Sequence, residues 1–257
     1  MKKTLLTICL VWMCFSLSAQ KIIDLSGKWS FSIDRQDNGE KEKWFSHTLN
    51  DFINLPGSMP EKLKGDEVTA KTQWTGSLYD SSYYYNPYME KYRKEGNIKF
   101  PFFLTPDKHY VGAAWYQKEV NIPADWKGER ILLFLERPHI ETTVWVNGQK
   151  TGMQNSLCVP HQYDITRYVR PGKCTITIRV DNRIKEINVG PDSHSITDQT
   201  QGNWNGIVGR ICLQTTPKTY FDDIQIYPEP EQKLARVKVV IKGTGTAKVK
   251  LSAESFN

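Results

Sequence analysis

Aromatic side chains that could bind a sugar gather in one long irregular segment of the chain. Residues 74–112 contain seven tyrosines, with little alternation and no helical stripe, whereas strands of compact sandwiches are joined by about two to five residues. Tyrosine and tryptophan rings stack on the apolar faces of sugar rings, and their polar groups bond hydroxyls. The segment therefore predicts a carbohydrate site, with packing of the rings against one another as the alternative.

A second irregular segment, residues 184–203, lacks hydrophobic periodicity over its whole length. A loop this long inside a compact domain is either disordered or held for a function. The residues alone leave both interpretations open.

Spacing identifies no catalytic pair and no metal site. Glu119, Glu136 and Asp181 stand as solitary acids in expected strands, which is typical of structural residues. No CxxC occurs, and the histidines are never spaced to share a helical face, so no metal site is predicted. These histidines are His47, His109, His139, His161 and His194. No cofactor is expected, and a divalent cation bound by loop oxygens is left open.

Residues 1–19 have the pattern of a secretory signal peptide. Lys2 and Lys3 precede an apolar run, and Ser18 and Ala19 are small enough for cleavage. The run is shorter than the ~20 residues of a membrane span. The sequence therefore predicts an exported protein, periplasmic or extracellular, that is not held in a membrane.

The composition of the chain disfavours a nucleic acid as partner. The formal charge is +6, from 34 Lys and Arg against 28 Asp and Glu, and the basic residues are scattered. The mature chain keeps Cys158, Cys174 and Cys212, an odd number in an oxidising compartment. At most one disulfide can form within the chain, and its pairing is left open.

Strands must position the two irregular segments, and residues 139–183 carry the clearest strand pattern. Residues 143–146 alternate with the period of a strand, and Asn147-Gly148 follows at once as a strong signal for a two-residue hairpin turn. Asp164 is predicted to cap the short turn after it, and residues 176–180 alternate again. Further strands are expected around Trp29, Phe31 and Ile33, after a Ser26-Gly27 turn, and at 130–136, so the fold class is all-β.

The end of the chain is expected to leave this first domain. Ile224 and Ile226 alternate and are predicted to point inward, completing a sandwich that ends at residue 230. Residues 231–257 then begin a new alternating pattern around a Gly243-Thr244-Gly245 turn, which is typical of the first hairpin of an immunoglobulin-like module. Such a hairpin is marginal without further strands.

Three ordered blocks resemble one known domain. WYQKEVNIPADWKGERILLFLERPHIETTVWVNGQKTG (115–152), YDITRYVRPGKCTITIRVDN (163–182) and NGIVGRICL (205–213) are similar to the amino-terminal sugar-binding domain of glycoside hydrolase family 2. This family includes β-galactosidases and β-glucuronidases. The resemblance implies a jelly-roll β-sandwich, galactose-binding-domain-like, over residues 20–230.

The resemblance also implies substrate-binding residues in both irregular segments. Asn97-Ile98-Lys99-Phe100-Pro101 resembles a loop of family β-galactosidases in which the asparagine bonds a sugar hydroxyl. Asp198 matches the first aspartate of a D-Q-D element, while Thr200 replaces the second. The Trp204 ring either stacks on the sugar or packs in the hydrophobic core. Asn97, Asp198 and Trp204 are therefore the candidate site, and a terminal galactoside is favoured.

Two functions fit these expectations. The first is the non-catalytic, substrate-shaping amino-terminal part of an exported exo-β-glycosidase, whose full-length form could be a homo-oligomer. Glycoside hydrolysis needs a carboxylate pair about 5 Å apart, and the family carries it on a barrel that these residues do not contain. The alternative is a stand-alone carbohydrate-binding module without hydrolase activity.

Overall fold

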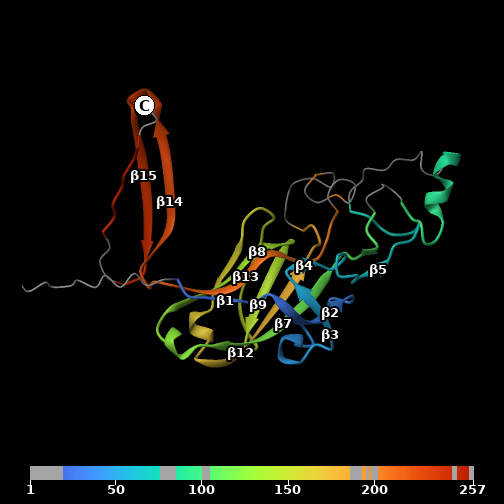
Figure 1. Ribbon diagram of the computed structural model, residues 1–257, viewed down its shortest axis with the longest axis horizontal. Coiled ribbons are helices and arrows are strands. Elements are labelled where there is room, and N and C mark those ends of the chain that lie inside the picture. Colours follow the sequence, from blue (N-terminus) through green and yellow to red (C-terminus); the bar gives the residue numbers. More distant parts are fainter. Residues whose placement is uncertain are drawn as a thin grey trace, which may run out of the picture.

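A computed structural model describes residues 20–75, 85–99, 105–185, 193–194, 197, 202–244 and 248–254. Two antiparallel sheets pack face to face and confirm the predicted all-β sandwich (Figure 1). The six-stranded sheet has the order β10 (Gln149–Asn155), β9 (Glu141–Val146), β12 (Gly172–Asp181), β7 (Ala113–Ile122), β2 (Gly27–Asp34) and β3 (Asp51–Leu55).

The facing sheet has five strands. Its order is β1 (Ile22–Asp24), β13 (Gly206–Thr216), β8 (Arg130–Pro138) and β11 (His161–Asp164), with β4 (Gly57–Ser58) also paired to β13. Short 3-10 helices connect the strands: η1 (Trp44–Ser46), η2 (Pro87–Arg93), η3 (Ala124–Trp126), η4 (Thr166–Tyr168) and η5 (Pro230–Gln232). A small pair, β5 (Asp66–Glu67) and β6 (Lys108–His109), lies at the base of the long insertion.

The core follows from the alternation in the central strands. Val144 on β9 and Ile178 on β12 are register partners, and both are fully buried between the sheets. On the outer face of the same sheet, Trp145 packs with Trp115 in a second, smaller cluster. The middle of β8, residues 131–135, is buried on both faces, as its continuous apolar run predicts.

Turn chemistry holds at the predicted corners. Asn147 and Gly148 both have positive φ, 50° and 76°, as a tight hairpin turn between β9 and β10 requires. The Asn147 side chain also accepts from the Thr175 backbone N–H at 2.9 Å, which fixes the turn to β12. Asp164 accepts from the Thr166 backbone N–H at 3.1 Å and so bonds the first residue of η4 as predicted, although the N-cap position itself is held by Ile165.

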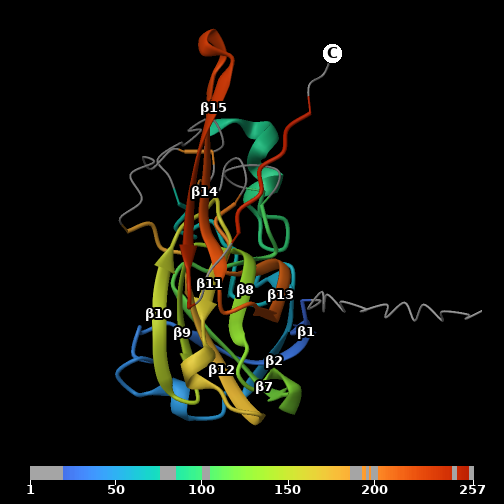
Figure 2. The same ribbon diagram turned by 90° about the vertical axis from the view of Figure 1, so that its left-hand side faces the viewer.

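The last two strands stand apart from the sandwich. β14 (Tyr220–Glu229) and β15 (Leu234–Lys242) pair only with each other, and Figures 1 and 2 show this hairpin projecting from the sheets. The prediction that Ile224 and Ile226 point into the sandwich is wrong, because their side chains are 52% and 64% exposed. The hairpin that the structure shows turns at η5, whereas the predicted Gly243–Gly245 turn extends into residues outside the described ones. The proposed domain division at residue 230 stays a prediction.

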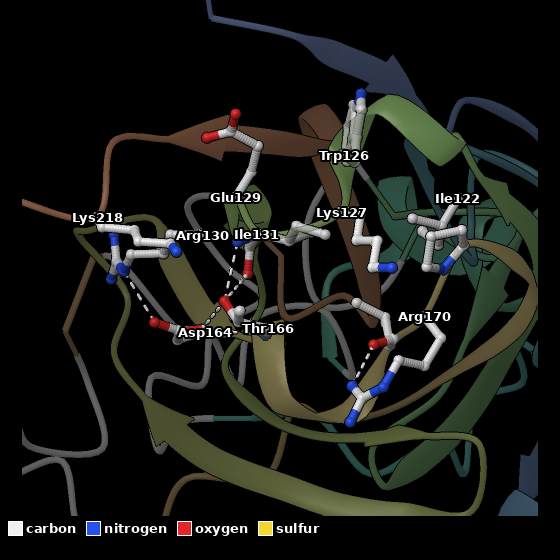
Figure 3. Close-up of a pocket in the computed structure, with 13 residues that line it drawn as sticks. Ile122, Trp126, Lys127, Glu129, Arg130, Ile131, Asp164, Thr166, Arg170 and Lys218 are labelled. Carbon is white, nitrogen blue, oxygen red and sulfur yellow. Dashed lines mark hydrogen bonds and ion pairs between the residues drawn. The ribbon is translucent and has the colours of Figure 1, made fainter.

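The two ends of the sandwich differ in construction. Register brings Asp34, Ala113, Asp181 and Glu141 to one end, from which the long insertion extends (Figure 1). η3 and η4 lie at the opposite end beside a separate pocket (Figure 3). Within the residues described, no helix is long and apolar enough to cross a membrane.

Candidate functional site

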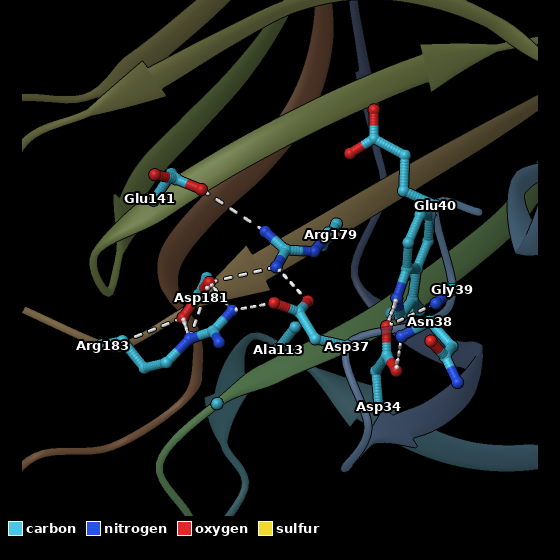
Figure 4. A network of polar contacts seen from close by, with 12 residues as sticks. Asp34, Asp37, Asn38, Gly39, Glu40, Ala113, Glu141, Arg179, Asp181 and Arg183 are labelled. Carbon is cyan, nitrogen blue, oxygen red and sulfur yellow. Dashed lines mark hydrogen bonds and ion pairs between the residues drawn. The ribbon is translucent and has the colours of Figure 1, made fainter. Parts of the chain in front are cut away.

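The loop end of the sandwich is built on a network of six charged side chains, all of which except Lys185 are labelled in Figure 4. Arg179 of β12 contacts three carboxylates: its guanidinium lies 2.6 Å from Asp37, 3.1 Å from Asp181 and 3.3 Å from Glu141. Two more cations, Arg183 and Lys185, join the same carboxylates from the chain just after β12. Each acid therefore meets at least two cations, and the network closes on itself.

Asp181 is the centre of this network and is fully buried. Burial alone would raise its pKa, but hydrogen bonds from Arg183 and Lys185 outweigh burial and hold the pKa well below its usual range. Its carboxylate also accepts from the Arg183 backbone N–H at 3.0 Å. Asp181 thus stays ionised and saturated with donors, which suits it to fixing the start of the 184–203 segment and not to proton transfer.

Three asparagines tie the irregular segments to the strand ends. Asn182 donates to the Tyr110 carbonyl at 2.8 Å and accepts from the Gly112 N–H at 2.8 Å. Asn205 donates to the carbonyls of Gly112 and Val180, both at 2.9 Å. These bonds hold residues 110–112 against the ends of β12 and β13.

Asn203 joins the two irregular segments to each other. Its amide nitrogen donates to Thr75 Oγ1 and to the Asn182 carbonyl, each at 3.0 Å. The sequence analysis missed Asn182, Asn203 and Asn205, although all three lie at strand ends, Asn182 at the end of β12 and the other two just before β13. An asparagine at a strand end indicates an anchor for a neighbouring loop, because its side-chain amide forms hydrogen bonds with backbone groups that the sheet leaves unpaired.

Trp204 lies between these anchors and stacks on His139, with ring centroids 4.6 Å apart and planes at 19°. His139 is buried, and burial lowers its pKa to about 4 although a hydrogen bond with Asn203 acts in the opposite direction. The imidazole is therefore neutral at pH 7. Trp204 is half-buried, with one ring face taken by His139.

Asn97 lies in the insertion, just after η2. Its backbone N–H donates to the Lys94 carbonyl at 3.0 Å, and its side-chain nitrogen donates to the Lys91 carbonyl at 2.8 Å. The side chain lines a pocket of about 650 Å³ together with Arg93 and Lys99. The Nη1 of Arg93 is buried there without a hydrogen-bond acceptor among the described residues.

The structure describes two of the three predicted site residues, Asn97 and Trp204. Asp198 lies outside the described residues, as do Phe100 and Pro101 of the Asn97 motif. In the part of the chain that is described, no hydrogen bond or ring contact joins Asn97 to Trp204. The two are linked indirectly, because Thr75 of the insertion bonds Asn203 beside Trp204.

The described residues provide neither a disulfide nor a metal-binding group at this end of the molecule. Cys158, Cys174 and Cys212 are free thiols, and burial raises the pKa of Cys174 to about 11. The described residues hold no group of three or more histidine, cysteine or acidic side chains placed to share a metal ion.

Known proteins resemble the chain over most of its length. Human β-glucuronidase is 24% identical over 89% of this chain and 34% of its own, and that of Paenibacillus borealis is 25% identical over 80% and 31%. Among solved structures, β-glucuronidase from an uncultured Clostridium species has a TM-score of 0.58 at 21% identity, covering 88% of this chain and 34% of its own. The chain spans about a third of these relatives.

Another solved relative is a complex with a ligand. The Ruminococcus gnavus β-glucuronidase, in complex with a C6-substituted uronic isofagomine, has a TM-score of 0.58 at 17% identity and covers 88% of this chain and 34% of its own. At such identity the likeness concerns the fold. The family model for the glycosyl hydrolases family 2 sugar binding domain matches residues 22–217, more than half of the chain. The chain therefore belongs to glycosyl hydrolase family 2 and contains its sugar binding domain.

Proposed function

We propose that this chain is the sugar-binding, substrate-shaping amino-terminal part of an exported β-glycosidase. The observation that carries the proposal is the pair of hydrogen bonds that the Asn203 side chain donates. They tie the aromatic insertion to the strand ends through Thr75 and Asn182. A site precise enough to select a sugar needs loops held by a rigid scaffold. The buried network around Asp181 supplies that scaffold at the same end.

The side chains at this end suit binding and not bond cleavage. Asn97 and Trp204 provide an amide and a ring, which bond hydroxyls and stack on sugar faces. Asp181 and Glu141 are engaged by Arg179 and Lys185, so neither is an acid free to donate a proton. Catalytic carboxylates are expected elsewhere in a longer protein, and the chain by itself is expected to show no turnover of aryl glycosides.

The preferred sugar has two candidates. The Asn97 motif favours a terminal galactoside, as its resemblance to β-galactosidase loops implies. A specific observation favours a uronide instead, because Arg93 lines the same pocket as Asn97 and its Nη1 has no hydrogen-bond acceptor among the described residues. A carboxylate is the acceptor that a guanidinium fits best, and the relatives named above are β-glucuronidases.

Kinetics of the full-length protein separates the two candidates. We would measure kcat/KM of Asn97→Ala, Asp198→Ala and Arg93→Met against an aryl β-galactoside and an aryl β-glucuronide. A lost hydrogen bond to a charged group costs roughly 1.5–3 kcal/mol, so Asp198→Ala should lower kcat/KM by about tenfold or more and exceed Asn97→Ala. Arg93→Met should lower only the glucuronide value if uronides are the substrate.

The control is Lys94→Met, which removes a neighbouring exposed charge that does not line the pocket. Wild-type kinetics in all three variants, or losses that only track unfolding, would show that the assigned site is wrong. Sugar binding without hydrolysis in the full-length protein would favour the stand-alone binding module.

Two further parts of the proposal concern the ends of the chain. Residues 1–19 have a signal-peptide pattern, so cell fractionation should place the mature protein outside the cytoplasm. Residues 231–257, which include β15, are proposed to begin a second β-sandwich with strands from the rest of the protein, and β14 pairs with the first of these strands. A retained leader in the purified protein would contradict export.

A further inference from the structure

Trp204 lies on a stretch of backbone that is held from both sides. The Asn205 carbonyl accepts from the Met59 N–H at 2.7 Å, and the Gly206 carbonyl accepts from the His139 N–H at 3.2 Å. Trp204 itself is half-buried, while the asparagines on either side of it in the chain are buried. The backbone under Trp204 is therefore fixed, and only the two side-chain torsions of the tryptophan remain to be set.

The polar atom of Trp204 is available to a ligand. Trp115, a core residue, donates its indole N–H to the Asp34 carboxylate at 2.9 Å. Trp204 Nε1 forms no such bond with any residue in the described part of the chain, where the His139 imidazole is the one ring that contacts it. A half-buried ring with an unused N–H can stack on the C–H face of a sugar and donate to one of its hydroxyls.

His139 contacts both this ring and the residue that joins the two irregular segments. The chain places it between the end of β8 and the start of β9. Its imidazole stacks on Trp204, with centroids 4.6 Å apart and planes at 19°, and it interacts with the Asn203 side chain. One side chain therefore supports the Trp204 ring from below and lies against the Asn203 anchor beside it.

The imidazole itself is out of reach of a ligand. His139 is only 6% exposed, and burial lowers its pKa to about 4, so it is neutral and covered at pH 7. A sugar at the loop end would meet Trp204 and not His139. Any effect of His139 on sugar binding must therefore act through the orientation of the Trp204 ring.

We infer that His139 is a positioning residue, which fixes the plane of the Trp204 ring and thereby sets the affinity for the sugar. Stacking requires the sugar face to lie parallel to the ring. A ring that is already fixed in that plane loses less side-chain entropy when the sugar binds. The inference rests on the proposed function, in which Trp204 contacts the sugar, and it adds a residue that no motif pointed to.

Kinetics of the full-length protein with an aryl glycoside that it hydrolyses tests the inference. His139→Leu fills the buried space without a ring, and it should raise KM about fivefold while kcat stays within about twofold of the wild type. His139→Phe restores a flat ring, and it should bring KM back to within about twofold of the wild type. His139→Gln is a second variant without a ring, to be used if His139→Leu does not fold.

The matched control is Phe45→Leu. Phe45 stacks on Trp145 with centroids 5.2 Å apart and planes at 5°, in the cluster on the outer face of the six-stranded sheet. The substitution removes the same kind of ring from beside a tryptophan that is not assigned to the sugar site. It should leave KM unchanged, and a rise equal to that of His139→Leu would overturn the inference.

A double-mutant cycle shows whether His139 acts through Trp204. Trp204→Ala should raise KM, and adding His139→Leu to it should raise KM no further, because residues that act as one unit are not additive. Additive losses, a wild-type KM for His139→Leu, or a failure of His139→Phe to restore KM would overturn the inference. If Trp204→Ala keeps the wild-type KM while Asn97→Ala and Asp198→Ala raise it, the inference falls and the proposed function stands without Trp204.

Discussion

The sandwich and the β14–β15 hairpin use the same strand pattern with opposite results. Ile178 on β12 and Ile226 on β14 each alternate with polar neighbours, yet Ile178 is fully buried and Ile226 is 64% exposed. The difference lies in what covers the apolar face, because β12 packs under a second sheet while β14 pairs with β15 alone. Alternation therefore specifies a strand and its two faces, but it does not specify the layer that covers the apolar face.

The hairpin is internally consistent in spite of its exposure. Register places Ile224 opposite Val239 and Ile226 opposite Val237, so one face is a continuous apolar surface. The other face carries an ion pair between Arg236 and Glu229 at 3.0 Å. A two-stranded hairpin with an open apolar face is marginal in water, whereas the sandwich buries the same kind of face completely.

Breaking one ion pair in each region should give the largest contrast. Arg179→Met removes the cation that contacts all three acids of the network and leaves these acids only Arg183 and Lys185, and removing one partner of a buried ion pair costs about 3–5 kcal/mol. Arg236→Met removes an exposed pair of the hairpin and should cost less than about 0.5 kcal/mol. Urea unfolding of the complete chain measures both, and equal losses would mean that the network around Asp181 is not a structural centre.

Truncating one isoleucine in each region should give the next contrast. Ile178→Ala opens a cavity between the sheets and should lower the free energy of unfolding by about 3 kcal/mol. Ile226→Ala removes a side chain that water already reaches, so the change should stay within about 0.5 kcal/mol. A loss above that for Ile226→Ala would show that the apolar face of the hairpin is covered in solution.

Much of the sandwich could be predicted from local signals. Asn147-Gly148 and the alternation of residues 143–146 and 176–180 are consequences of backbone geometry, and they hold in the structure. The partner of β15 could not be predicted in this way. Both 220–229 and residues after 248 alternate beside β15, and the choice between them depends on turn geometry at η5.

The candidate site was less accessible to sequence reasoning, because its contacts join distant residues. Arg179 meets Asp37 across 142 positions, and Asn203 meets Thr75 across 128. No local pattern encodes such pairs. Asn97 was named from a motif and lines a pocket, and its role in binding stays a prediction, whereas its relation to Trp204 could not be inferred from spacing.

Acid should weaken the sandwich and not the hairpin, which has no histidine in residues 220–242. His139 has a folded pKa of about 4 against an ordinary value of 6.5, so the unfolded chain binds the extra proton between these values. The contribution of His139 to the free energy of unfolding is therefore complete above pH 6.5 and is lost as the pH falls toward 4. At pH 5 the loss amounts to about 2 kcal/mol. The stabilisation from the lowered pKa of Asp181 is lost only below about pH 4, in a separate window.

The variant His139→Gln isolates this acid effect, because glutamine does not titrate. Its unfolding free energy should change less between pH 7 and pH 5 than that of the wild type, by about the same 2 kcal/mol. His47→Gln is the control, since His47 is exposed. If His139→Gln and wild type show parallel pH profiles, then the imidazole is not held neutral by burial.

Removal of the hairpin should have the smallest effect. In the described chain, the ion pairs of β14 and β15 lie within the hairpin, and the Arg130 guanidinium stacks over Tyr220 at 3.8 Å as a contact with the sandwich. Such a contact is worth about 1 kcal/mol or less at an exposed site.

Deleting residues 219–257 should therefore lower the melting temperature by only a few degrees, and Tyr220→Ala in the complete chain should reproduce most of that shift. Tyr227→Ala, an exposed ring without a partner in the sandwich, should leave it unchanged. A larger drop on deletion than on Tyr220→Ala would mean that the hairpin docks its apolar face on the sandwich, and the contrast between a covered and an uncovered face would not describe the protein in solution.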